Sequence, residues 1–119
     1  DGGCLMTVTF YGAEKVVEEY NLMGPVKAAL ESSVRYMAAE LGKKNIRVHA
    51  LSPGPLKTRA ASGIDRFDEL LERTRERVPD HQLVSIEDVG NFAAFLADDK
   101  AKALTGNISY IDGGYHILG

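Results

Sequence analysis

The sequence lacks tryptophan, contains one cysteine and has no long run of apolar residues. Because the single cysteine, Cys4, cannot form a disulfide within the chain, the composition fits a reducing compartment, and we expect a cytoplasmic protein. A membrane-spanning helix needs about 20 consecutive apolar residues, and no stretch approaches that length. The sequence therefore predicts no membrane partner.

A strong excess of charge is also missing. The net charge of −3 disfavours binding to nucleic acid or to anionic membrane surfaces. The histidines His49, His81 and His116 do not have the spacing of metal ligands, so we expect no metal site. Neither a Gly-x-Gly-x-x-Gly turn nor a P-loop occurs, so nothing in this sequence is suited to cradle a pyrophosphate.

The most regular apolar pattern lies between Tyr20 and Leu41, and it predicts a long helix. Steps of three and four residues form one apolar stripe, made of Val26, Leu30, Val34, Met37 and Leu41. In a helix that begins at Tyr20, two turns bring Tyr20 and Lys27 to one face. A phenol beside an ammonium group is a proton donor whose pKa is lowered by the neighbouring charge. A core helix with a half-buried tyrosine and a surface lysine is the alternative, and the pair taken alone favours it.

Strands and helices alternate along the rest of the chain. Apolar, β-rich segments predict strands at 4–10, 46–52 and 107–111, and amphipathic segments predict helices at 65–78 and 86–96. Strands separated by helices form parallel sheets with crossover connections. The predicted fold class is therefore α/β, with three strands and helices between them.

Ligands of such sheets bind beyond the carboxyl ends of the strands. That edge collects residues 10–20, 52–63 and 112–115. Since Tyr20 and Lys27 belong to the same edge, the topology supports interpreting them as a candidate site.

A second tyrosine–lysine pair lies nearby. Tyr11 and Lys15 match the Tyr-x-x-x-Lys pattern of many short-chain dehydrogenases. That pattern requires helical spacing and a serine on the preceding strand, where this chain has only Thr7 and Thr9. We interpret the pair as a chance match.

Several motifs in a fixed order resemble one family along the whole chain. The motifs YNLMG, KAALE, NIRVHALS, AASGI, IEDVGN and IDGGY occur in this order. They resemble the C-terminal half of bacterial enoyl-acyl-carrier-protein reductase, a short-chain dehydrogenase/reductase type. The resemblance implies that residues 1–119 form a single partial domain, the C-terminal part of a Rossmann-like doubly wound parallel sheet whose first half is missing.

The resemblance also implies an activity, which is reduction of the trans-2 double bond of enoyl thioesters on acyl carrier protein by NAD(H), with NADP(H) as the alternative. Tyr20 would hydrogen-bond the thioester oxygen as an enolate develops, and Lys27 would hold the nicotinamide ribose. Cofactor contacts are expected from Lys27, Leu56, Lys57, Thr58 and Ala60. The acyl pocket is expected to be lined by Met23, Ala60, Ala61 and Phe67.

The chain departs from the family at several positions. Phe10 stands where a tyrosine is common in the family, and Tyr11 follows one step later. Whether a second phenol acts on the substrate is therefore left open by the sequence. His49 replaces the usual asparagine. Arg59 replaces an aliphatic residue and either forms an outward ion pair or narrows the pocket.

The resemblance further implies a homotetramer and a preceding half that carries the glycine-rich loop. We expect the chain, which begins at Asp1 just before a core strand, to be the later part of a longer protein. We also expect the segment alone neither to bind the dinucleotide tightly nor to turn over. Two alternatives remain, which are a short-chain ketoreductase or alcohol dehydrogenase and a non-catalytic truncated paralogue.

Overall fold

Three parallel strands form a single sheet in a computed structural model that describes residues 2–56, 58, 63 and 66–118. The strands lie in the order β1 (Gly3–Val8), β2 (Ile46–Pro53) and β3 (Ile108–Ile111). The register pairs Val8 with Leu51 at the end of β1 and Pro53 with Ile111 at the end of β3. All three strands therefore end at the same edge of the sheet.

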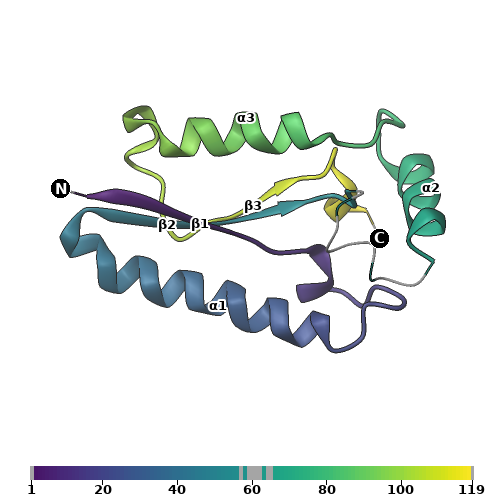
Figure 1. The fold of residues 1–119 in the computed structure, drawn as a ribbon, viewed down its shortest axis with the longest axis horizontal. Coiled ribbons are helices and arrows are strands. Elements are labelled where there is room, and N and C mark those ends of the chain that lie inside the picture. Colours follow the sequence, from purple (N-terminus) through teal and green to yellow (C-terminus); the bar gives the residue numbers. More distant parts are fainter. Residues whose placement is uncertain (1, 57, 59–62, 64–65, 119) are drawn as a thin grey trace.

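Helices cover both faces of this sheet, as Figure 1 shows. The helix α1 (Met23–Leu41) lies along one face, α3 (Ile86–Ala97) lies along the other, and α2 (Phe67–Arg77) lies beyond the carboxyl ends of the strands. Short 3₁₀ turns complete the chain: η1 (Tyr11–Ala13), η2 (Gly42–Lys44), η4 (Asp99–Ala101) and η5 (Tyr115–Ile117). The α/β fold predicted from the alternating pattern is confirmed. No helix among the described residues has the length and apolar content to cross a membrane.

Two hydrophobic cores hold the helices to the sheet, because successive side chains of β2 point to opposite faces. The core under α1 contains Val34, Ala38, Val48 and Ala50. The core under α3 contains Leu51, Leu96 and Ala101. Full burial of a large aliphatic side chain contributes roughly 1.5–3 kcal/mol, so these contacts fix both helices relative to the strand ends.

The helix α1 begins at Met23, so the prediction that it starts at Tyr20 is wrong. The cause is Pro25, which has no N–H group and would clash with a carbonyl four residues earlier inside a helix, but which the first turn tolerates. Tyr20 instead lies in a turn. Its N–H donates to the Val17 carbonyl at 3.1 Å, and its carbonyl accepts from the Met23 N–H at 3.2 Å.

The buried face of α1 also differs from the predicted stripe. Val34 is buried as expected, but Val26 and Met37 are 53% and 41% exposed. Their places against the sheet are taken by Glu31 and Ala38. The helix carries apolar residues on two faces, and periodicity alone does not say which face meets the sheet.

The centre of β2 buries a histidine completely. His49 is 0% exposed, and neither ring nitrogen makes a hydrogen bond of ordinary geometry within the described part of the chain. Burial and the neighbouring charge of Arg47 lower the pKa of His49, and the backbone of Leu104 only partly opposes this effect. His49 is therefore held in its neutral form by the fold.

This burial makes stability depend on pH. Because the folded-state pKa of His49 lies below the unfolded value, the unfolded chain takes up a proton first, and stability falls as the pH drops below about 6.5. The slope from one such group is at most about 1.4 kcal/mol per pH unit. In thermal melts between pH 7 and pH 5, His49→Asn should lose less Tm than the wild type. The exposed His81, changed to Asn, is the control and should melt like the wild type at each pH; equal acid sensitivity of all three proteins would contradict the prediction.

Candidate active site

A cavity of about 320 Å³ opens at the carboxyl ends of β1 and β2. It lies between the end of β1, the first turns of α1, the loop after β2 and the start of α2. Six residues that the sequence analysis assigned to the site line it: Tyr20, Met23, Lys27, Leu56, Thr58 and Phe67. The other three, Lys57, Ala60 and Ala61, lie outside the described residues, as does Arg59.

Tyr20 forms a buried wall of this cavity. Its side chain is 8% exposed, and its ring meets the edge of the Phe10 ring with centroids 5.1 Å apart. Burial raises the pKa of the Tyr20 hydroxyl, which corrects the expectation that a neighbouring charge would lower it. The phenol therefore stays protonated at neutral pH and can act as a hydrogen-bond donor.

Lys27 lies one turn into α1 and points to the end of β1. Its Nζ donates to the Val8 carbonyl oxygen at 3.1 Å. An ammonium group has three N–H donors, so this bond orients the side chain and leaves two donors for a ligand. Lys27 and Tyr20 line the same cavity although only Lys27 belongs to the helix.

The loop after β2 forms the opposite wall. Pro53, Gly54 and Pro55 are all buried, and the Gly54 N–H donates to the Ile111 carbonyl at 3.0 Å. A Cβ on Gly54 would lie 3.3 Å from the backbone of Asp112, so glycine allows the loop to pack against the chain that follows β3. The prolines fix φ on both sides of this contact and hold the approach of Leu56 to the cavity.

A buried pair that sequence reasoning missed joins β1 to α1 behind the cavity. The Thr9 hydroxyl donates to the Glu31 carboxylate at 2.6 Å, and the residues are 1% and 6% exposed. Glu31 lies one helical turn after Lys27, and Thr9 follows the Val8 carbonyl that Lys27 contacts. The pair therefore fixes the helix turn that carries Lys27 against the end of the strand.

Breaking this pair should destabilise the protein. Thr9→Val keeps the shape of the side chain but leaves the buried Glu31 carboxylate without its donor, a change that costs about 1–3 kcal/mol. A urea titration should show a lower midpoint for Thr9→Val and a smaller fall for Thr9→Ser, which keeps the hydroxyl and loses only a buried methyl group. Equal midpoints for all three proteins would contradict the role of this hydrogen bond.

Tyr11 does not belong to the cavity. Its ring packs edge-on against Tyr115 with centroids 5.5 Å apart, and the Arg77 guanidinium lies 5.3 Å from the centre of the Tyr115 ring. Tyr11 therefore joins η1 to the chain after β3. The Phe10 side chain lies next to Tyr20 in the cavity and has no hydroxyl, so no second phenol joins Tyr20 among the described lining residues.

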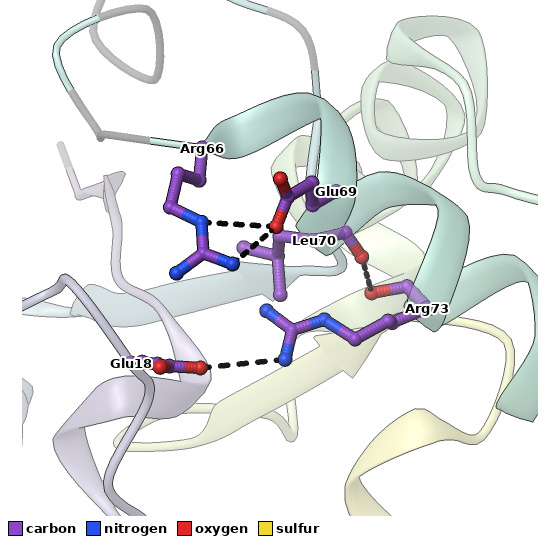
Figure 2. A network of polar contacts seen from close by, with 6 residues as sticks. Glu18, Arg66, Glu69, Leu70 and Arg73 are labelled. Carbon is purple, nitrogen blue, oxygen red and sulfur yellow. Dashed lines mark hydrogen bonds and ion pairs between the residues drawn. The ribbon is translucent and has the colours of Figure 1, made fainter.

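The helix α2 is tied to the loop that leads to Tyr20, as Figure 2 shows. Arg73 of α2 reaches Glu18 with an Nη1–Oε2 distance of 3.4 Å. A shorter pair, Arg66 with Glu69 at 2.7 Å, lies at the start of α2. Both pairs are largely exposed and add little stability. The buried Phe67 at the start of α2 lines the cavity, so α2 contributes one of its walls.

Comparison with known proteins identifies the family. The family model described as enoyl-(acyl carrier protein) reductase matches residues 1–116, and the chain belongs to this family. The "Enoyl-[acyl-carrier-protein] reductase [NADH] 1" of Rhizobium meliloti is 51% identical over the whole chain, which covers 44% of that protein. The "Enoyl-[acyl-carrier-protein] reductase [NADH] FabI" of Aquifex aeolicus is 50% identical over 98% of the chain, which covers 43% of that protein.

Solved structures agree with this assignment. The enoyl-acyl carrier protein reductase of Bacillus cereus, solved with NADP+ and indole naphthyridinone, matches 99% of the chain with a TM-score of 0.95 and 46% identity. The NADH enzyme of Aquifex aeolicus matches 98% with a TM-score of 0.94 and 50% identity. These matches cover 46% and 45% of the two solved chains, so the sequence spans less than half the length of its relatives.

Proposed function

We propose that this chain forms the catalytic half of an NADH-dependent enoyl-acyl-carrier-protein reductase. The observation that carries the proposal is the cavity that brings Tyr20 and Lys27 together with the loop after β2. Family membership supports the same reaction, because relatives that match the chain over its whole length are named as NADH-dependent enoyl reductases. Acyl carrier protein would then deliver the substrate.

The residues of the cavity fit the nicotinamide–ribose end of the cofactor. The volume of about 320 Å³ falls in the range of small-ligand sites. The two donors of Lys27 that Val8 does not use suit a ribose diol, and Leu56 and Thr58 would meet the ring through the loop held by Gly54. Since the sequence has no glycine-rich phosphate turn, a preceding segment would hold the pyrophosphate.

When bound, the reduced nicotinamide supplies a hydride to the β-carbon of the enoyl thioester. The Tyr20 hydroxyl donates a hydrogen bond to the thioester oxygen as negative charge grows there, which lowers the barrier in the way an oxyanion hole does. The α-carbon of the enolate then takes up a proton that comes ultimately from solvent, which gives the saturated thioester. Met23 and Phe67, which line the cavity, would form its acyl side and exclude water from the reacting carbons.

We further propose a cytoplasmic homotetramer in which α1 packs against another subunit. The support for the assembly is the second apolar face of α1, where Val26, Tyr36 and Met37 are 53%, 77% and 41% exposed. Multi-angle light scattering of the full-length protein tests the assembly. A monodisperse monomer at micromolar concentration would contradict it.

The reaction is tested with the full-length protein that contains this segment. Crotonyl thioester and NADH should give loss of NADH absorbance, while acetoacetyl thioester should give none. Reduction of acetoacetyl thioester alone would favour a ketoreductase, and activity with neither would favour a non-catalytic paralogue. The purified 119-residue segment should be inactive and bind NADH weakly, and normal turnover by the segment would contradict its assignment as a partial domain.

A further inference from the structure

The ring of Tyr20 lies directly on the backbone of Gly12. A Cβ at position 12 would lie 2.4 Å from Cδ2 and 2.7 Å from Cε2 of Tyr20, closer than real Cβ contacts come. By contrast, a Cβ at Gly3, Gly42 or Gly90 would meet nothing within 4 Å. The glycine beneath the phenol therefore has no room for a side chain, whereas these three glycines do.

Space, and not backbone conformation, is what requires glycine here. Gly12 lies in η1 and is not among the glycines with positive φ, so an L-amino acid could adopt its backbone conformation without strain. A Cβ on Gly24, at the start of α1, would in turn lie 3.0 Å from the Gly12 carbonyl oxygen. The Gly12 backbone is thus enclosed by the phenol and by the first turn of the helix, and it has little room to retreat.

A second residue also contacts the Tyr20 ring. Phe10 meets it edge-on at 5.1 Å with an interplanar angle of 62°. A ring displaced by a side chain at Gly12 would be driven toward Phe10 or out of its pocket. The position of the Tyr20 ring is therefore constrained by contacts with both Gly12 and Phe10.

The backbone on either side of Tyr20 is held in an uncommon conformation. Glu19 and Asn21 have φ values of 68° and 54°, in the left-handed region that residues other than glycine seldom adopt. The side-chain Nδ2 of Asn21 donates to the backbone carbonyl of Glu19 at 3.4 Å, and this hydrogen bond links the two strained residues. Such strained residues cluster at functional sites, where the surrounding structure imposes them.

We propose that Gly12 is a positioning residue, whose missing side chain sets the depth and direction of the Tyr20 phenol in the cavity. This inference rests on the proposed function for its catalytic consequence. A hydrogen-bond donor acts on a developing oxyanion only within a narrow distance range. To restore an ordinary contact of at least 3.4 Å, a Cβ at position 12 requires the ring or backbone to move by about 1 Å.

The kinetic test is Gly12→Ala in the full-length protein, with crotonyl thioester and NADH. A misplacement of this size lowers kcat about 10²-fold. The KM for NADH should stay within about threefold, because the phenol acts on the thioester oxygen and not on the cofactor. Gly42→Ala is the matched control and should retain the wild-type kcat, because a Cβ at Gly42 meets open space. A folded Gly12→Ala protein with wild-type kcat would overturn the proposal.

A stability cycle tests the contact independently of activity. Gly12→Ala should lower Tm in the wild-type background but not in a Tyr20→Ala background, where the ring is absent. An equal fall in both backgrounds would overturn the proposal. Even if Gly12→Ala alone fails to fold, a folded double variant would support it, and an unfolded double variant beside a folded Tyr20→Ala protein would overturn it. Inactivity of the wild type would refute the reductase assignment while leaving this cycle decisive for the contact.

Discussion

Replacing Tyr20 by phenylalanine should lower kcat for enoyl-thioester reduction about 10²- to 10³-fold, the effect of removing one oxyanion donor. The substitution removes only the hydroxyl and keeps the ring and its contacts with Phe10 and Gly12, so the fold should not change. KM for NADH should stay near the wild-type value, because the phenol acts on the thioester oxygen. Steady-state kinetics with crotonyl thioester measure both parameters.

Tyr11→Phe is the matched control for this experiment. Tyr11 is also a tyrosine near the end of β1, but its ring packs against Tyr115, outside the cavity. Its hydroxyl should therefore be dispensable for catalysis. If Tyr11→Phe lowered kcat and Tyr20→Phe did not, the roles assigned to the two phenols would have to be exchanged.

Replacing Lys27 by methionine should reduce kcat/KM for NADH about 10²-fold. Two charge-assisted hydrogen bonds to a ribose diol, at about 1.5 kcal/mol each, give about 3 kcal/mol. Methionine keeps most of the aliphatic stem of Lys27. Water can replace the lysine as the hydrogen-bond donor to the Val8 carbonyl, because Val8 is half exposed. The loss should therefore appear in NADH kinetics and not in Tm.

Two further variants test whether the position of the charge matters. Lys15→Met removes a lysine from the other Tyr–Lys pair, outside the cavity, and should leave NADH kinetics unchanged. Lys27→Arg keeps the charge but should not restore activity, because a planar guanidinium cannot hold both Val8 and a ribose in the geometry of a compact ammonium. Full activity of Lys27→Met would refute the proposed role.

The arrangement of strands and helices could be predicted because its signals are local. Alternating apolar segments predicted all three strands, and the parallel order followed from the helices between them. The predicted start of α1 is too early because the Tyr20–Lys27 spacing extended the helix beyond the apolar stripe, which begins at Val26, and past a proline. Pro25 carries the missed signal, since a proline favours the first turn of a helix over its interior.

Contacts between elements that are distant in the sequence cannot be predicted from the spacing of apolar residues. Glu31 is buried against Thr9, although a glutamate in an amphipathic helix is ordinarily a surface residue. The close approach of Gly12 to Tyr20 depends on how η1 packs against α1, which no spacing in the sequence reveals. The position of Tyr20 and Lys27 at one edge could be inferred, but the groups that hold them there could not.

The outer edge of β1 has a practical consequence. β1 pairs with β2 on one side, no described strand lies on its other side, and Leu5 and Val8 are 45% and 52% exposed. Unpaired amides and carbonyls along such an edge bind an extended segment as a new strand. The described fold therefore leaves one edge of its sheet open to pairing with a further extended segment, through backbone hydrogen bonds that require no particular side chains.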